Sequence, residues 1–337
     1  MTTLQDVAKA AGVSSSTVSR VLKGNAKISM ATTKKVLDAA RRLEYRPIIL
    51  ADKFTEAPTK VLGVIMSMQI QDAFYFPILE RIFNTADQLG YGVLSYRLDT
   101  RYGTQSNSDI LKAMEGRVDA VIFVGVFSFN KDDLKPFIQQ KCPMVSLFGV
   151  IDAPGIINCT TDNIQAAYEA TQYLIRLGHT RIAHMLIHKT FEHALERLEG
   201  YKAALEDHGI AYNPDLVAIG DFSYEGAYKA ALQLIESQSF TAVFCFNDVM
   251  ADAFIRAARD RGLKVPEDVS VMGFDDIVYE NPIFYPAPLM TTMRQPRREM
   301  ADFAIKAIMD SKRGLETFEN TVFRPMLIER NTTKPIG

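Results

Sequence analysis

One short stretch near the N-terminus carries small hydroxyl side chains and an arginine at helical spacing. A predicted helix over residues 15–22 turns its apolar residues inward and presents on its outer face Ser15, Ser16, Ser19 and Arg20. Serine can donate to or accept from several base edges, whereas arginine can bind O6 and N7 of guanine with two hydrogen bonds. This face is a candidate reader of the major groove, with Arg20 as its best single reader. Solvent exposure alone is the alternative explanation of a Ser-rich face.

A second set of polar residues follows apolar runs of strand length in the rest of the chain. Asn247 follows the run 242–246, Asp275 follows the run 270–274, and Arg197 opens a helical segment. A carboxylate and a guanidinium that converge on one cleft beside aromatic rings can hold the hydroxyl groups of a small polar ring. Each of these residues taken alone also fits an ordinary strand end or helix cap.

The sequence lacks the common motifs of enzymes and cofactor sites. It has no phosphate-binding P-loop, no GxGxxG after the first predicted strand, no HExxH and no GxSxG. The five histidines fall between residues 179 and 208 without a set of acidic ligands, so structural or surface roles are expected rather than metal binding. The three cysteines are far apart and fit buried thiols. We therefore expect no catalytic residue, no metal and no cofactor.

Three short helices must position the candidate reading face. Apolar residues at spacings of three and four predict a first helix that ends at Gly12. Ser14 can cap the second helix, and Ser29 can cap a third helix that runs to Leu43. Two helices joined by a tight turn that contains glycine place the second helix in the major groove.

The charge distribution favours a polyanionic partner for this segment. Residues 1–60 hold 11 Lys and Arg against 5 Asp and Glu, a balance of +6, which leaves −8 for residues 61–337 because the whole chain of 337 residues is at −2. A basic head on an acidic body is typical of a head that meets nucleic acid, and a merely Lys-rich helical surface is the alternative. We find no run long and apolar enough for a membrane span and no signal peptide, so we expect a cytoplasmic protein at the nucleoid.

The rest of the chain alternates predicted strands with amphipathic helical segments. Strands are predicted at 61–66, 92–96, 120–124, 144–147, 181–187, 241–246 and 269–274. Helices are predicted at 77–89, 163–177, 195–206, 224–236 and 251–261. This alternation indicates parallel sheets wound with helices, and about 270 residues are too many for one such sheet. The predicted fold class is a small all-α helix-turn-helix head plus an α/β body of two doubly wound parallel-sheet lobes that face a cleft.

Residues 4–14 (LQDVAKAAGVS) and 17–22 (TVSRVL) resemble the helix-turn-helix signature of the LacI/GalR family of bacterial transcription regulators, and the resemblance continues to Pro47. It implies a homodimeric repressor on a near-palindromic double-stranded DNA operator, and a body like that of periplasmic binding proteins. It also implies that Ser15, Ser16 and Arg20 read bases. The residues expected to contact DNA are Thr3, Gln5, Ser14, Ser15, Ser16, Thr17, Ser19, Arg20, Lys23, Asn25, Ala51 and Phe54.

The linker, residues 47–60, resembles the family's hinge but departs from it. The family implies a helix that folds on DNA and wedges an apolar side chain into the minor groove. Phe54 stands where a leucine is usual, Ile48 where an asparagine is usual, and Asp52 where an arginine is usual. A carboxylate near phosphates weakens binding unless a cation neutralises it. A plain tether in which Phe54 packs on the body is the alternative.

Segments of the body also resemble the family's effector domain. They are RLEGY at 197–201, FND at 246–248, VMGFDD at 271–276 and TTMRQP at 291–296. The resemblance implies that a small-molecule effector is bound by Arg197, Asn247 and Asp275 in a pocket also lined by Phe74, Tyr75 and Phe222.

Departures from the family bear on the identity of the effector. Gly149 stands where many sugar-responsive members carry Asp, and Phe191 and His193 stand where purine-responsive members place polar groups. The second departure argues against a purine as the effector, so a sugar or sugar derivative is the expected effector.

The predicted organisation has three parts. We expect a DNA-binding domain at 1–46, a linker at 47–60, and an effector-binding and dimerisation domain at 61–337 whose lobes are joined by crossovers near 160, 291 and 322. Closure of the lobes around the effector would change DNA affinity by linkage. Two other classes share such a body. An exported sugar receptor would lack residues 1–59, and a sugar-metabolising enzyme with an accessory DNA-binding head would need a catalytic constellation.

Overall fold

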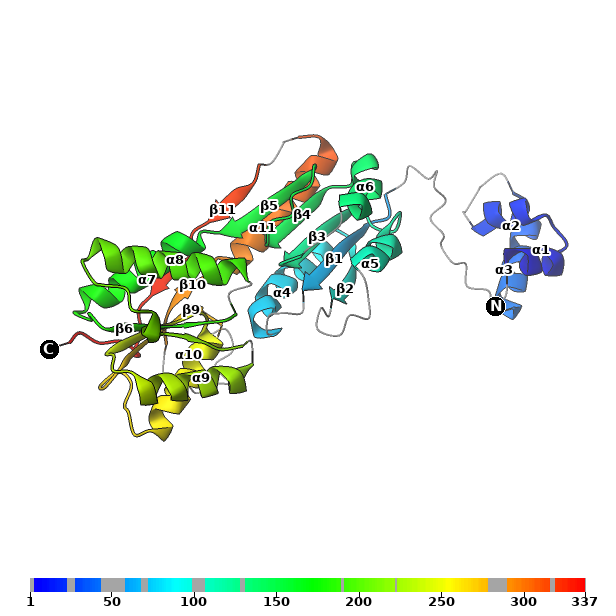
Figure 1. Cartoon of the computed structure of the whole chain (residues 1–337). Helices are drawn as coiled ribbons and strands as arrows, with labels where there is room; N and C mark the ends of the chain where they lie inside the picture. Colours follow the sequence, from blue (N-terminus) through cyan, green and yellow to red (C-terminus); the bar gives the residue numbers. More distant parts are fainter. Residues whose placement is uncertain are drawn as a thin grey trace. The chain divides into compact units, whose positions relative to one another are not determined.

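The computed structural model describes residues 3–22, 28–43, 58–67, 72–98, 107–127, 131–188, 191–221, 223–277, 290–315 and 319–336 (Figure 1). Contacts divide the chain into two compact units, Met1–Pro58 and Thr59–Gly337, which we call the head and the body.

The described part of the head is a set of three short helices around one small core. They are α1 (Leu4–Ala11), α2 (Ser15–Leu22) and α3 (Met30–Arg42). Thr3 and Asp6 cap α1 reciprocally, and Gly12 ends it in the left-handed conformation with φ 67°. Val7, Val18 and Val36 contribute one fully buried side chain from each helix. The helices predicted from the sequence are confirmed, because period, caps and glycine all agree in this segment.

Lobe 1 of the body is, within the described residues, a parallel sheet of six strands in the order β11-β5-β4-β3-β1-β2. These strands are β1 (Val61–Ser67), β2 (Gly92–Leu98), β3 (Ala120–Gly125), β4 (Met144–Phe148), β5 (Ile156–Thr161) and β11 (Thr321–Phe323). Its helices are α4 (Asp72–Gln88), α5 (Asn107–Met114), α6 (Lys131–Gln139) and α11 (Arg297–Arg313).

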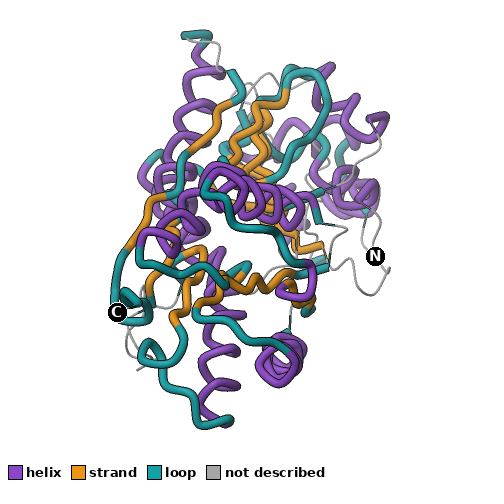
Figure 2. The backbone as a smooth tube through the Cα atoms, turned by 60° about the vertical axis from the view of Figure 1, so that its left-hand side comes forward, coloured by secondary structure: helices purple, strands orange, loops and turns teal. Residues whose placement is uncertain are grey.

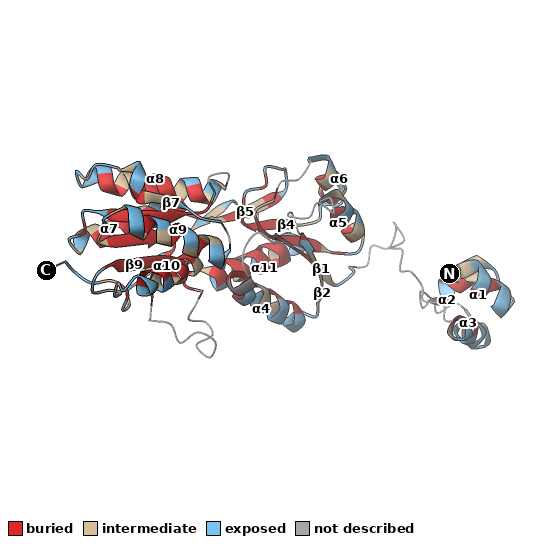
Figure 3. Cartoon of the chain, turned by 60° about the horizontal axis from the view of Figure 1, so that its bottom comes forward, coloured by how far each residue is buried: buried red, intermediate tan, exposed pale blue. Residues whose placement is uncertain are grey.

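The alternation of side chains along β1 decides which helices cover which face of lobe 1. Leu62 and Val64 belong to the core that α4 and α11 close, whereas Ile65 belongs to the core that α5 and α6 close. Successive strand residues point to opposite faces, so one strand supplies both cores. Figure 3 shows the buried residues concentrated along the strands and the inner sides of these helices.

Lobe 2 is a second sheet, which in the described part of the chain has six strands in the order β12-β10-β9-β8-β6-β7. The strands are β6 (Ile182–Leu186), β7 (Val217–Ile219), β8 (Ala242–Cys245), β9 (Ser270–Asp275), β10 (Thr291–Arg294) and β12 (Met326–Ile328). Only the β10–β12 pair among them is antiparallel. The covering elements are α7 (Asn163–Arg176), α8 (Glu192–Asp207), the short 3-10 turn η1 (Pro214–Leu216), α9 (Tyr224–Ser237) and α10 (Asp248–Asp260).

The chain passes between the two lobes at 161–163, 294–297 and 323–326. Figure 2 shows the two groups of strands, each packed against helices, with the connecting segments between them. Each lobe is therefore built from parts of the chain that are distant in sequence.

The predicted start of α4 at Pro77 is wrong. Proline lacks an N–H group and is common at the beginning of a helix, which favoured that start. In the structure α4 begins at Asp72, so Pro77 lies inside it and Phe74 and Tyr75 belong to its first turns. The sequence pattern also gave no prediction for α5, α6, α11 or the strands β5, β7, β10, β11 and β12.

Among the described residues, no helix has the length and apolar character needed to cross a bilayer.

Candidate functional sites

The outer face of α2 carries the residues that the sequence predicts to read bases. Ser16 and Arg20 are exposed, Ser15 and Ser19 are partly exposed, and Val18 on the opposite face is fully buried. The helix thus offers hydroxyl groups and one guanidinium to solvent, which is the chemistry that readout of base edges requires.

Ser14 caps α2 with its side chain, as predicted. Its hydroxyl accepts a hydrogen bond from the backbone N–H of Thr17 at 3.2 Å, which satisfies a donor at the start of the helix. The same hydroxyl lies 2.8 Å from that of Ser16 and 2.9 Å from that of Thr17. The network orders hydroxyl groups at the end of the helix that points to base edges in a helix-turn-helix.

The other predicted DNA contacts divide into two sets. Thr3 caps α1 through its hydroxyl, and Gln5 is exposed in the first turn. Outside the described residues lie Lys23, Asn25, Ala51 and Phe54, together with the linker departures Ile48 and Asp52.

Positive charge dominates the described surface of the head. The exposed cations are Lys9, Arg20, Lys34, Lys35 and Arg42. The carboxylate of Asp6 accepts hydrogen bonds from the Thr3 hydroxyl at 2.7 Å and its backbone N–H at 2.8 Å, and these bonds lower the pKa of Asp6. An excess of cations attracts a polyanion such as the phosphate backbone of DNA.

A cleft between the two lobes of the body forms where parallel strands of both sheets end. The described residues that line it are Ser67, Phe74, Val126, Phe148, Thr161, Ile187, Phe191, Glu192, His193, Arg197, Phe246, Asn247, Asp275 and Gln295. Ligands of open α/β sheets bind at the carboxyl ends of strands, because successive strands place side chains there. The cleft therefore brings together four predicted effector residues, namely Phe74, Arg197, Asn247 and Asp275.

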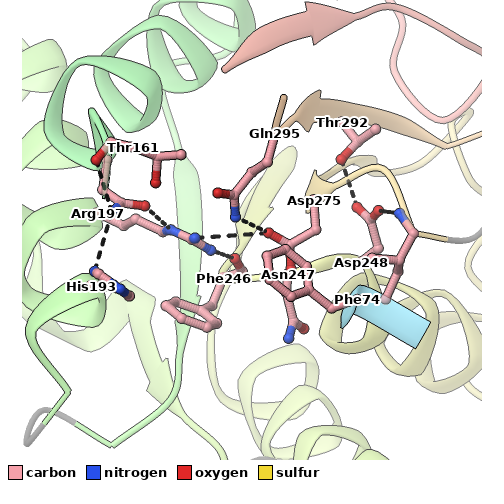
Figure 4. A network of polar contacts seen from close by, with 12 residues as sticks. Phe74, Thr161, His193, Arg197, Phe246, Asn247, Asp248, Asp275, Thr292 and Gln295 are labelled. Carbon is pink, nitrogen blue, oxygen red and sulfur yellow. Dashed lines mark hydrogen bonds and ion pairs between the residues drawn. The ribbon is translucent and has the colours of Figure 1, made fainter. Parts of the chain in front are cut away.

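Arg197 and Asp275 form the charged centre of this cleft (Figure 4). Their side chains approach to 3.8 Å, and both residues are almost fully buried. The guanidinium lies 4.3 Å from the ring centre of Phe246 and 3.6 Å from that of Phe274, and its Nε donates to Asn163 at 3.0 Å. Burial lowers the pKa of Arg197 to about 10, so the side chain stays charged at neutral pH.

Asp275 is held in an unusual backbone conformation. Its φ is 105°, which non-glycine residues rarely adopt and which is often found at functional sites. Gln295 donates to its carboxylate at 2.6 Å. Burial raises the pKa of Asp275, while Arg197 and Gln295 act in the opposite direction.

Two buried polar atoms of the described cleft lining have no hydrogen-bond partner. Within the described residues, the hydroxyl of Ser67 and the amide oxygen of Gln295 are buried and make no hydrogen bond. Buried polar groups are nearly always satisfied, so such atoms indicate a binding site for a polar ligand.

Asn247 has a double role at the cleft. Its amide oxygen accepts from the backbone N–H of Met250 at 2.9 Å and so caps α10. The amide nitrogen is the part of this side chain left for a ligand.

The cleft is asymmetric in polarity. Lobe 1 supplies three apolar side chains and the hydroxyls of Ser67 and Thr161, whereas all charged and amide groups come from lobe 2. The cavity measures about 50 Å³, well below the roughly 300 Å³ of ordinary ligand pockets. A ligand of that usual size enters only when the lobes or their side chains move apart.

The remaining predicted pocket residues lie elsewhere. Tyr75 is buried outside the cleft lining, with its ring 5.1 Å from that of Phe74, and burial raises the pKa of its hydroxyl. Phe222 lies outside the described residues.

Gly149 has a steric reason to be glycine. A Cβ atom there would lie 2.5 Å from the carbonyl oxygen of Gly125 and 3.0 Å from Cα of Val126. Strands β3 and β4 end too close together at this point for any side chain, so the aspartate that the family pattern suggests has no room.

Sequence reasoning missed several lining residues, including Ser67, Thr161 and Gln295. Ser67 is the last residue of β1 and lies one residue beyond the predicted strand 61–66, so a strand bound one residue longer would have indicated it. Thr161 ends β5 and Gln295 follows β10, two strands that the sequence pattern did not predict.

The histidines have separate structural settings. His179 lies 2.9 Å from the Thr241 hydroxyl and 3.0 Å from that of Ser270. His184 stacks between Tyr201 and Phe244, and its burial lowers its pKa to about 4. No group of three His, Cys, Asp or Glu side chains in the described part of the chain is arranged to hold a metal ion.

The chain is similar to known proteins over its whole length. Residues 3–47 match the lacI family of bacterial regulatory proteins, and residues 171–333 match the periplasmic binding protein-like domain. The HTH-type transcriptional regulator DegA of Bacillus subtilis is 32% identical over 100% of this chain and 99% of its own length.

Solved structures also match this chain over nearly its whole length. The lac repressor dimer bound to operator and the anti-inducer ONPF has a TM-score of 0.71 at 27% identity, with 99% of each chain covered. The complex of the transcriptional regulator CelR with cellobiose has a TM-score of 0.67 at 28% identity, covering 98% of this chain and 100% of that one. These matches confirm the predicted fold class, and the relatives are named as regulators rather than enzymes. The chain therefore belongs to the LacI family of bacterial regulatory proteins and is a DNA-binding transcriptional regulator under the control of a small-molecule effector.

Proposed function

We propose that a homodimer of this chain represses transcription by binding a near-palindromic operator, with α2 in the major groove and Arg20 as the main base reader. The exposed hydroxyls and guanidinium on α2 support this proposal, and the cations around them supply the attraction to phosphates. Its place of action is the cytoplasm, on the nucleoid.

We propose further that the effector is a sugar or sugar derivative bound in the cleft between the lobes. The asymmetric lining is the observation that carries this proposal. Hydroxyl groups of a sugar ring can bind Asp275, Arg197 and Asn247 of lobe 2, while the apolar face of the ring packs on Phe74 and Phe148 of lobe 1. CelR, solved with cellobiose, supports a carbohydrate.

Control of DNA binding follows from linkage. The effector shifts the balance between open and closed lobes only by binding one arrangement more tightly than the other. Because the head is joined to lobe 1 through β1, a shift of lobe 1 in the dimer changes the spacing of the two heads and hence operator affinity.

The test begins with operators selected by the full chain from a random duplex library. Sugars, glycosides and nucleosides are then screened by thermal shift, and active compounds are added to operator titrations followed by fluorescence anisotropy. We expect at least one carbohydrate to raise Tm and to change the operator Kd by about fivefold or more. The Asp275→Ala variant should bind the operator but ignore that compound. A response to nucleosides alone would contradict the sugar, and failure to select any sequence would contradict the proposed operator.

A further inference from the structure

Arg297 makes hydrogen bonds to both lobes. It is the first residue of α11, just after one of the three crossovers, and only 2% of it is exposed. Its Nη1 donates to the backbone carbonyl of Phe74 in lobe 1 at 3.2 Å. Its Nη2 donates to the backbone carbonyl of Asp276 in lobe 2 at 3.0 Å. One guanidinium therefore holds main-chain atoms of both lobes.

Both partners are part of, or next to, the cleft lining. Phe74 lines the cleft with its own side chain, and the guanidinium of Arg297 lies 5.4 Å from the centre of its ring. Asp276 follows the lining residue Asp275. A movement of either wall of the cleft must therefore displace one of the two hydrogen-bond acceptors of Arg297.

The attachment on the lobe 2 side is held by two ion pairs. The carboxylate of Asp276 is paired with Arg294 at 2.6 Å and with Arg330 at 2.7 Å. Because these pairs fix Asp276 to β10 and to the segment after β12, a change in lobe separation moves the lobe 1 partner, α4, relative to this anchor.

We propose that Arg297 is a positioning residue that ties α4 to the end of β9 and so sets the balance between open and closed lobes on which operator affinity depends. The inference rests on the proposed role of the cleft, but not on the identity of the effector. A planar guanidinium with two donors on one fork can serve two carbonyls at once, and a lysine ammonium cannot reproduce that geometry.

The neighbouring Arg298 provides a matched control. Its side chain is 59% exposed and lies 3.8 Å from Glu80 of α4, so it also joins α11 to α4 but entirely within lobe 1. Loss of Arg298 removes an arginine from the same turn of the same helix without touching lobe 2.

The experiment compares the full-length wild type with Arg297→Met and Arg298→Met by hydrogen exchange and by operator titration. In Arg297→Met we expect amide exchange to rise about tenfold both in the first turns of α4 and at 275–277, while β8 keeps its protection. The selected operator duplex serves as the probe of function. Its Kd should change about tenfold with an unchanged salt slope, because no phosphate contact is lost. Arg298→Met should match the wild type in both measurements.

Arg297→Lys covers the case in which Arg297→Met does not fold. It keeps the charge, and its changes in amide exchange and in operator Kd should have the same pattern but be smaller than tenfold. The proposal is overturned if exchange rises in one lobe only or throughout the body, if Arg298→Met behaves like Arg297→Met, or if operator Kd stays the same. None of these measurements uses an effector, so a failure here is distinct from a failure of the sugar proposal.

Discussion

Asp248 is a carboxylic acid placed where water does not reach it. It is fully buried at the start of α10, accepts from the Thr292 hydroxyl at 2.6 Å and from the backbone N–H of Ile277 at 2.8 Å. Burial and the nearby charge of Asp275 raise its pKa to about 8. Gly273 allows this packing, because a Cβ there would lie 2.1 Å from the Asp248 carboxylate.

Asp248→Asn should therefore change how stability depends on pH. With the folded pKa above the unfolded value of 3.8, the folded wild type binds the proton more tightly, so its stability falls as pH rises from about 4 to 8. Asparagine keeps an acceptor for Ile277 and a donor toward Thr292 without that titration. Urea unfolding measures this effect. The free energy of unfolding of the variant, relative to that of the wild type, should increase by at least about 1 kcal/mol from pH 5 to pH 8. Parallel pH profiles would contradict the raised pKa.

A second prediction at this scale concerns Arg20. Arg20→Ala should cost about 1 to 3 kcal/mol on the selected operator and almost nothing on random duplex, because a base contact is lost. Lys23→Ala is the contrasting variant, chosen from the sequence. It should weaken binding to both duplexes and reduce the salt slope by up to about one unit. Titrations at several salt concentrations separate the two effects, and equal loss on both duplexes for Arg20→Ala would remove it as a reader.

Among the elements, the start of β1 is fixed by one side chain. Asp119 accepts from the backbone N–H and the hydroxyl of Thr59, both at 2.7 Å, and from Lys312 of α11 at 2.7 Å. Burial acts to raise its pKa, but Lys312 and Thr59 outweigh it and leave the pKa below the usual value of 3.8. The point at which the chain enters the body is thus tied to α11.

Asp119→Asn should destabilise the body by about 1 to 3 kcal/mol at neutral pH, because charge-assisted hydrogen bonds are lost. A carboxylate with a lowered folded pKa contributes stability above its unfolded pKa and loses it as pH falls through the folded value. The difference from the wild type should therefore shrink below about pH 4. Denaturant unfolding at pH 7 and pH 3 measures this difference in the free energy of unfolding. A constant difference at both values would assign the effect to packing.

The same scale shows what a sequence can and cannot predict. The helix α2 is fixed by local signals, the Ser14 cap and the apolar period of Val18 and Val21, so its predicted bounds are confirmed. The start of α4 is not set by local signals, because Phe74, Tyr75 and Ile78 around Pro77 are buried in a core that α11 also closes, and no short window reveals that packing. The cleft lies between these cases. Asn247 and Asp275 follow strands that the sequence pattern predicts. Which side chains lie beside them in the cleft, such as Ser67 and Gln295, depends on the order of the strands in the two sheets, which no local pattern gives.

For the whole molecule, α4 offers a surface for the proposed homodimer. Phe76 and Phe83 lie seven residues apart on one face of the helix and are 64% and 40% exposed. Large apolar side chains gathered on one surface mark interaction sites. We expect Phe83→Lys to raise the dimer dissociation constant about tenfold or more, because an aromatic interface contact is replaced by a charge.

Analytical ultracentrifugation over a range of concentrations measures this change. Leu195→Lys is the control, since Leu195 is 48% exposed on α8 of the other lobe. If Leu195→Lys dissociates the dimer and Phe83→Lys leaves it intact, the interface lies elsewhere.

The narrow gap between β3 and β4 also limits how this regulator could be adapted to new metabolites. The backbone of Gly125 occupies the space beside position 149, so natural variation or protein engineering has no access to ligand preference through that site. New preferences must arise on the opposite wall, from substitutions around His193 and Gln295. Libraries for a reprogrammed biosensor would accordingly keep Gly125 and Gly149 and randomise the lining residues of lobe 2.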